Sequence, residues 1–311
     1  MNKVTISPKN YYGWAGYCLS NGEIEIGITP SIGGRIISLC YQQEELLYVD
    51  KNRLGETFEL GVIDDLSTFK KNFGFRLWGG DKTWVAPEQS WVAGIPPLHL
   101  DAGQYTTQLD EKSITMTSPL DQETGLQITR KVTLQSGGEI TLTQQFTNQS
   151  NKIILCGIWD VTQLLRPFRI YFPARKEQVK PDTRFAASLG NQHELLTTVA
   201  KDWVEIRCEK PLQFKYSFDI ERGIAIALKE QADHFIAMIR YFKVNPKANY
   251  PQAGIVEVYN SDNYPYLELE VLSPSAELSH HDNIIHQQTW ILKRFPKTMT
   301  IETILSSVVE S

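Results

Sequence analysis

Three of the seven tryptophans, Trp78, Trp84 and Trp91, lie in one short stretch, LWGGDKTWVAPEQSW, at residues 77–91. An indole has a flat apolar face and a polar edge, which suits the C–H faces of a pyranose ring, and neighbouring polar groups can bind sugar hydroxyls. The charged residues of the stretch are Asp81, Lys82 and Glu88. The stretch therefore predicts a sugar-binding pocket. The alternative is that its indoles only pack this segment onto the core.

A pair of carboxylates with the spacing for proton transfer lies near the end of the chain, in YLELEVLSP at residues 266–274. Glu268 and Glu270 alternate with apolar residues, so on a strand they share one face, roughly 7 Å apart. Carboxyl groups can act as general acids or bases. Glu257 and Tyr259, in IVEVY, share a face in the same way and are expected to line the same concavity. The alternative in both cases is ordinary strand alternation with an exposed polar face.

Strands must position these residues, because alternation at a period of two runs through most of the chain. In EITLTQQFT, Ile140, Leu142 and Phe146 share one face and polar residues occupy the other. Similar runs predict strands at residues 23–28, 113–118, 126–134, 223–229 and 299–305. The sequence therefore predicts an all-β protein.

Local signals divide these strands. The glycines of QSGGE, between Leu134 and Ile140, predict a tight antiparallel hairpin. Residues 77–91 fit neither the strand nor the helix period, and their paired glycine and proline predict a rigid loop. Helical periodicity is limited to short candidates at residues 64–71 and 192–201.

No composition shift, linker or repeat divides the chain, so we expect one domain over residues 1–311. A β-domain of this length must close into a barrel or stack its sheets to bury their faces.

The composition excludes several partner classes. A net charge of -5, without a long basic run, gives no electrostatic footprint for nucleic acid or an anionic membrane. The N-terminus has no apolar stretch of signal-peptide length, and no window is long enough for a membrane span, so a cytoplasmic location is expected. The four cysteines lie far apart in apolar segments and are expected to be reduced core residues.

No motif predicts a cofactor or a metal. The chain lacks a phosphate-binding loop, a nucleophile elbow and paired CxxC motifs. The histidines of SHHDNIIHQQTW, residues 279–290, fit no strong zinc spacing, and we expect a solvated loop there. His99, in PPLHLD, is a candidate proton donor for the pocket; the alternative is a lone histidine whose hydrogen bonds are satisfied in place.

Four segments together resemble the galactose mutarotase-like (aldose 1-epimerase) superfamily. In chain order they are IGGRIISL (32–39), LWGG (77–80), ITLTQQFTNQSNKIILCGIWDVTQL (140–164) and YLELEVLSP (266–274). The match is closest to a branch with GGDKxWxAPE, WxVTQ and ELExLSP elements in the same order. The resemblance implies a β-supersandwich of large antiparallel sheets with a concave, sugar-binding face.

The resemblance also implies catalytic roles. Glu270 falls at the position of the superfamily's glutamate base, but Trp78 replaces the histidine of its Leu-His-Gly-Gly segment and Trp159 stands near its second histidine. Indole cannot transfer the catalytic proton at neutral pH. A carboxyl group kept protonated by burial could replace the lost acid, although such groups often form structural ion pairs instead. The replacement candidates are Asp81, Lys82 and Asp160.

Further residues of the matched segments and of the same strand faces form the expected substrate-binding set. Arg35, in GGRI, could reach an anionic group of a sugar, but the bidentate pairing of guanidinium with carboxylates favours a role in anchoring a carboxylate inside the fold. The whole expected set is Arg35, Trp78, Trp84, Glu88, Trp159, Gln163, Glu257 and Glu268.

Two functions with a small carbohydrate as partner follow from these residues. The first is a sugar epimerase or isomerase that uses Glu270 and a non-standard acid. The second is a non-catalytic sugar-binding domain that has lost mutarotase activity. A structural or regulatory β-domain would instead leave the polar groups on different surfaces.

Overall fold

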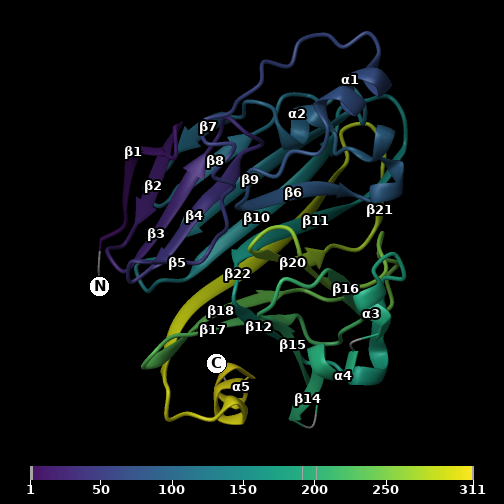
Figure 1. Ribbon diagram of the computed structural model, residues 1–311. Coiled ribbons are helices and arrows are strands. Elements are labelled where there is room, and N and C mark those ends of the chain that lie inside the picture. Colours follow the sequence, from purple (N-terminus) through teal and green to yellow (C-terminus); the bar gives the residue numbers. More distant parts are fainter. Residues whose placement is uncertain (1–2, 191, 201, 310–311) are drawn as a thin grey trace.

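The computed structural model describes residues 3–190, 192–200 and 202–309, and most of it is two large β-sheets (Figure 1). Neighbouring strands run antiparallel, as in the pairs at the centre of each sheet. These sheets confirm the prediction of an all-β fold made of stacked antiparallel layers.

The first sheet carries most of the predicted site residues. Its main strands, in spatial order, are β1 (Thr5–Tyr11), β2 (Trp14–Ser20), β3 (Ile24–Thr29), β4 (Arg35–Tyr41), β6 (Asp81–Ala86), β11 (Ile154–Leu165), β20 (Tyr266–Leu272), β19 (Val256–Asn260), β16 (Phe214–Phe218) and β13 (Val179–Pro181). The short strands β5 (Glu44–Glu45) and β21 (Ala276–Leu278) pair with β4 and β11. Segments far apart in the sequence therefore meet on β6, β11, β20 and β19.

The second sheet packs against the first and forms the main core with it. Its strands, in spatial order, are β14 (Leu196–Ala200), β15 (Trp203–Cys208), β12 (Phe168–Phe172), β17 (Ile224–Glu230), β18 (His234–Phe242), β22 (Asn283–Pro296), β10 (Ile140–Asn148), β9 (Leu126–Leu134), β8 (Ser113–Thr117) and β7 (Thr106–Leu109). Ile140, Leu142 and Phe146 are fully buried in this core, on the face that alternation predicts.

The predicted hairpin is present. Leu134 of β9 pairs with Ile140 of β10, and Gly138 in the turn between them adopts a φ of 92°. A φ in this range favours glycine, because it brings the Cβ of other residues too close to the backbone.

The helices are short and lie outside the two sheets. They are α1 (Leu66–Phe73), α2 (Leu98–Asp101), α3 (Ala186–Gly190), α4 (Gln192–Leu195) and α5 (Ile301–Val309), with 3₁₀ turns at Glu88–Ser90, Val92–Gly94 and Lys176–Gln178. α1 fits the candidate at residues 64–71. The candidate at 192–201 is helical only in α4 and continues as β14, and its last residue lies outside the described part of the chain. None of the described helices is long and apolar enough to cross a membrane.

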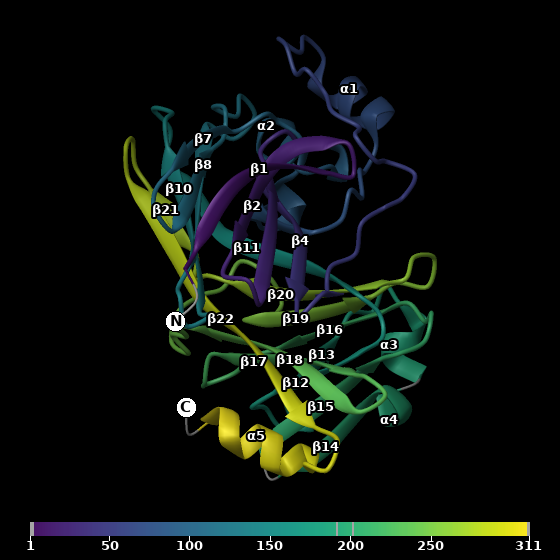
Figure 2. The same ribbon diagram turned by 90° about the vertical axis from the view of Figure 1, so that its left-hand side faces the viewer.

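The strand predicted at residues 299–305 is wrong, because α5 occupies this region and lies beside β14 at the end of the second sheet (Figure 2). Ile304, Leu305 and Val308 are buried and follow the helical spacing of three and four residues. The alternating run at residues 299–305 therefore does not form a strand.

The loop predicted at residues 77–91 is also wrong in its centre, which forms β6 between β4 and β11. The period of two is present there but hidden, because Lys82 and Trp84 face outward while Asp81 and Thr83 face the second sheet. Both faces of β6 are buried, so no polar and apolar alternation marks it.

Paired glycines allow the chain to enter β6. Gly79 has a φ of 103°, and a Cβ on it would lie 2.1 Å from the carbonyl oxygen of Tyr48. Gly80 has a φ of 75°, and its Cβ would lie 2.3 Å from the carbonyl oxygen of Ile36. A side chain at either position would force the neighbouring backbone apart.

Candidate functional site

A cavity of about 290 Å³ opens on the outer face of the first sheet. It lies opposite the main core, which contacts the other face of β6, β11 and β20 through residues such as Val85, Ile158 and Leu269. The lining residues come from five strands and from the loops above them. They are Phe75, Leu77, Trp84, Glu88, Trp91, Trp159, Arg184, Phe185, Lys215, Tyr259, Tyr266 and Glu268. We call this cavity the tryptophan pocket.

Strand register brings these side chains together. Trp84 of β6 lies opposite Trp159 of β11. Two outward-facing rows further along the sheet, beyond the row of Val161 and Glu270, Glu268 of β20 lies opposite Tyr259 of β19, and Tyr259 lies opposite Lys215 of β16. Directly opposed residues lie within about 5.5 Å of each other, so the rows form a continuous floor.

Three indoles form one wall of the pocket. The ring centroids of Trp84 and Trp91 are 5.3 Å apart, those of Trp84 and Trp159 are 5.2 Å apart, and those of Trp91 and Trp159 are 5.7 Å apart. Each indole N–H donates a hydrogen bond of 2.8 Å. Trp84 donates to Asp101 Oδ1, Trp91 donates to the Val85 carbonyl oxygen, and Trp159 donates to Glu270 Oε2. The contacts and hydrogen bonds together fix the orientation of the rings.

Arg35 positions this wall from behind. Its Nη2 donates to Asp101 Oδ1 at 2.6 Å, and the same oxygen accepts the Trp84 N–H. The side chain of Arg35 is buried and also donates to backbone carbonyl oxygens. It therefore anchors a carboxylate inside the fold, which is the alternative left open by the sequence, and it does not line the pocket.

Glu268 is the carboxylate of β20 that lines the pocket. Its Oε1 accepts hydrogen bonds from Lys82 Nζ at 3.1 Å and from Gln163 Nε2 at 2.9 Å. Lys82 Nζ also lies 4.3 Å from the ring centroid of Trp84. Burial lowers the pKa of Lys82, more than the attraction of Glu268 raises it.

Glu270 lies deeper, in contact with a second lysine. Lys215 Nζ is 2.9 Å from Glu270 Oε2, 2.7 Å from Glu257 Oε2, and 4.9 Å from the ring centroid of Trp159. Burial alone would lower the pKa of Lys215, but the two carboxylates raise it above its ordinary value. Burial raises the pKa of Glu270 to about 8. The ammonium group of Lys215 can neutralise only one of the two carboxylates. The raised pKa of Lys215 is therefore consistent with the raised pKa of Glu270.

Eight of the predicted site residues form one connected group. Trp84, Glu88, Trp159 and Glu268 line the pocket. The other four contact lining residues from behind, and they are Lys82, Gln163, Glu257 and Glu270.

The expectation that Asp81 or Asp160 replaces the missing acid is wrong, because both side chains lie on the opposite face of the sheet. Asp81 forms an ion pair with Arg130, and Asp160 forms one with Arg240; all four side chains are fully buried. Burial, with the nearby Asp160, raises the pKa of Asp81 to about 7. Neither carboxyl group lines the tryptophan pocket.

Trp78 also corrects an expectation, because it is fully buried in a separate apolar cluster. Its ring centroid lies 6.1 Å from that of Phe58, and the Arg35 guanidinium lies 5.2 Å from its ring. The preceding residue, Leu77, lines the tryptophan pocket instead.

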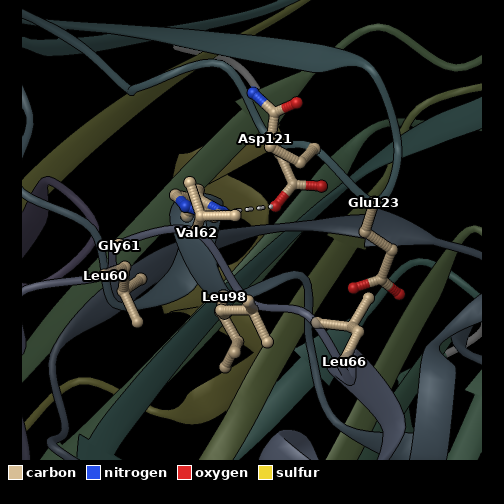
Figure 3. A pocket seen from close by; sticks show the side chains of 10 residues that line it. Leu60, Gly61, Val62, Leu66, Leu98, Asp121 and Glu123 are labelled. Atoms are coloured by element: carbon tan, nitrogen blue, oxygen red, sulfur yellow. Dashed lines mark ion pairs between the residues drawn. The ribbon is translucent and has the colours of Figure 1, made fainter.

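His99 lies in a different cavity, of about 670 Å³, between α2 and the segment before α1. There its Nδ1 is 3.4 Å from Asp121 Oδ2. Figure 3 shows Val62, Leu98 and Asp121 in the lining of this cavity. His99 therefore cannot supply a proton in the tryptophan pocket.

The histidines of residues 279–290 are separated by the fold. His280 and His281 lie in the turn before β22, whereas His286 is buried within that strand. Burial lowers the pKa of His286 to about 4. The prediction of a solvated loop is therefore wrong from Asn283 onward.

Sequence reasoning missed several lining residues, chiefly Lys215 and Arg184. Lys215 could have been found, because in FKYSF a lysine and a serine alternate with three aromatic residues, the pattern of a strand with one polar face. Arg184 comes from a loop whose sequence contains no comparable signal.

The sequence matches a protein-family model over residues 17–293, described as "Domain of unknown function (DUF4380)". The chain belongs to this family. No curated protein matches the DUF4380 chain.

Solved structures share the fold of this DUF4380 chain at low sequence identity. Slr1438 from Synechocystis sp. PCC 6803 has a TM-score of 0.59 and 11% identity, over 94% of this chain and 99% of that one. A galactose mutarotase-like protein from Lactobacillus casei ATCC 334 has a TM-score of 0.56 and 11% identity, over 89% and 99%. A galactose mutarotase related enzyme from Lactobacillus acidophilus has a TM-score of 0.55 and 9% identity, over 92% and 100%. The chain therefore has a galactose mutarotase-like β-sandwich fold.

Proposed function

We propose that this DUF4380 chain binds a pyranose sugar in the tryptophan pocket. The observation that carries the proposal is the presence of three fixed indoles and the Glu268 carboxylate in one cavity. Two proteins with this fold are named as galactose mutarotase-like or related, which supports a sugar as the ligand class.

The two kinds of side chain divide the recognition between them. Trp91 and Trp159, stacked with an interplanar angle of 27°, offer apolar surface to the C–H groups of the ring. Glu268 Oε1 is held by Lys82 and Gln163, and the side chain lines the cavity. A sugar hydroxyl can donate to this carboxylate, whose fixed position gives the ligand its orientation.

The proposal is tested by titrating a panel of hexoses and pentoses and following them by ligand-observed NMR. Glu268→Gln keeps the size of the side chain but removes its charge, so we expect it to weaken binding about tenfold or more, as for a charge-assisted hydrogen bond. The matched control is Glu230→Gln, on an exposed carboxylate of β17, and it should leave the affinity unchanged. Failure of the wild type to bind any sugar of the panel would contradict the proposal.

A second candidate function is interconversion of the sugar's anomers, favoured by the contact between Lys82 and Glu268. One group must remove the proton of the anomeric hydroxyl while another protonates the ring oxygen. Glu268 is the base in this proposal, in place of Glu270, because it is the one that lines the cavity. Lys82 Nζ lies directly behind the lining, 3.1 Å from Glu268 Oε1, and it is the acid in this proposal: a sugar that contacts Glu268 brings its ring oxygen toward this group, and the lowered pKa of Lys82 favours proton release.

Exchange NMR of glucose and galactose separates the two candidates. Faster anomer exchange with the wild type, lost in Glu268→Gln, would show catalysis. Sugar binding with an unchanged exchange rate would leave a binding protein.

A further inference from the structure

A second cavity, of about 570 Å³, adjoins the tryptophan pocket over β16 and β13. Glu88, Arg184 and Lys215 line both cavities, so the two share a boundary. A third cavity, of about 360 Å³, shares Lys180 and Gln252 with the second. The outer part of the first sheet therefore carries a row of connected hollows, and the tryptophan pocket is at one end.

Part of the boundary between the first two cavities is an ion pair between exposed side chains. Arg184 Nη1 lies 3.5 Å from Glu88 Oε1, and these two side chains are 60% and 34% exposed. An exposed ion pair of this length contributes little to stability, so a ligand can displace it at small cost. A chain-like ligand can therefore pass from one cavity to the next.

The second cavity differs from the tryptophan pocket in its chemistry, because none of the described residues that line it is aromatic. Its lining is rich in hydroxyl, amide and charged groups, among them Ser217, Thr183 and Gln252. The Nε2 atom of Gln252 is buried and has no hydrogen-bond partner among the described residues. An unpaired buried donor is costly, and an oxygen of a bound ligand would satisfy it.

Charge pairing decides which class of ligand fits. Each cation around the second cavity contacts a carboxylate: Lys180 Nζ with Asp219 at 2.5 Å, Arg184 Nη2 with Asp182 at 2.7 Å, and Lys215 Nζ with Glu257 at 2.7 Å. The positive charges are therefore already neutralised, and an acidic sugar would meet carboxylates as well as cations.

We propose that the connected cavities bind a neutral oligosaccharide of two or more pyranose units. The first unit lies on the indoles of the tryptophan pocket, and the next unit lies in the polar second cavity, where Gln252 donates to one of its oxygens. This inference rests on the proposed function and names its substrate class.

Calorimetric titration with two series of sugars tests the inference. One series is glucose, maltose and maltotriose, and the other is glucose, cellobiose and cellotriose. We expect at least one disaccharide to bind about tenfold more tightly than glucose, because the second unit adds hydrogen bonds in the second cavity. Gln252→Met removes the amide donor at similar size and should abolish this gain while leaving the affinity for glucose unchanged. The matched control, Gln287→Met, changes an exposed glutamine on β22 and should keep the gain.

The outcomes separate the two proposals. If glucose binds and neither disaccharide series binds more tightly, the oligosaccharide proposal is overturned while the proposed function stands. If digalacturonate binds more tightly than every neutral disaccharide, the neutral class is overturned. If no mono- or oligosaccharide binds, both proposals are overturned.

Discussion

Glu268 and Glu270 lie two residues apart on β20 and point to the same face, but their surroundings differ. Glu268 lines the tryptophan pocket and contacts Lys82. Glu270 is fully buried beneath Trp159, and burial raises its pKa to about 8. The two carboxyl groups therefore suit different tasks: Glu268 can contact a ligand, whereas Glu270 orients an indole.

The raised pKa of Glu270 predicts a pH dependence of stability. The folded protein holds this proton up to about pH 8, while the unfolded chain releases it near the ordinary value of 4.5, so the contribution to stability falls as the pH rises through this window. Relative to Glu270→Gln, the wild type should lose free energy of unfolding between pH 5 and pH 8. Urea denaturation at each pH measures this difference.

The control for this prediction is Glu277→Gln, which changes an exposed glutamate on β21. Its stability should run parallel to that of the wild type over the same pH range. A constant difference between the wild type and Glu270→Gln would show that Glu270 does not exchange a proton in this window.

At the scale of the element, β6 contributes to two separate polar systems. Its outward residues, Lys82 and Trp84, belong to the tryptophan pocket, whereas Asp81 and Thr83 face the second sheet. The inward system joins the sheets through buried ion pairs of Asp81 and Asp160 with arginines of β9 and β18. The strands under the pocket are therefore held in register by a polar layer as well as by apolar packing.

Removing one charge from this layer should be strongly destabilising. Asp160→Asn leaves the buried guanidinium of Arg240 without its carboxylate, and loss of one partner of a buried pair typically costs about 3–5 kcal/mol. The exposed pair of Arg169 and Glu209 provides the control, since Glu209→Gln should cost at most about 1 kcal/mol. Chemical denaturation measures both variants. Equal effects would show that the buried layer does not hold the sheets together.

At the scale of the whole molecule, the chain closes a second apolar cluster with its C-terminal helix. Ile304, Leu305 and Val308 of α5 pack with Ile226 and Phe295 of the second sheet, on the face that points away from the main core. Both faces of this sheet are therefore covered over part of its area, and the site lies on the far side of the other sheet.

Leu305→Ala should remove a buried side chain of this cluster and lower the free energy of unfolding by about 2–5 kcal/mol. Ser306→Ala, at the next and exposed position, should change it by less than about 0.5 kcal/mol. Thermal and urea denaturation measure the two variants. Sugar binding at the tryptophan pocket should survive Leu305→Ala at temperatures where the variant is folded. An equal loss of free energy of unfolding in Leu305→Ala and Ser306→Ala would contradict the packing of α5.

Much of the candidate site was predictable because strand alternation fixes which residues share a face. It placed Glu268 with Glu270 and Glu257 with Tyr259, and the tryptophan-rich stretch indicated where an aromatic wall would lie. It could not place Asp81, because a strand buried on both faces has polar residues on each side. Lys215 and Arg184 reach the pocket only through β16 pairing with β19 and through a distant loop.

The sequence by itself determined much of the local structure of this protein: most of the strand periods and the hairpin at Gly138. These depend on neighbouring residues, whose spacing is written in the chain. Only the tertiary structure decided that Trp78 leaves the pocket, that Asp81 and Asp160 face the second sheet, and that Glu268 rather than Glu270 lines the cavity. Those outcomes depend on pairings between strands far apart in the sequence, and burial and electrostatic partners arise only when such strands meet.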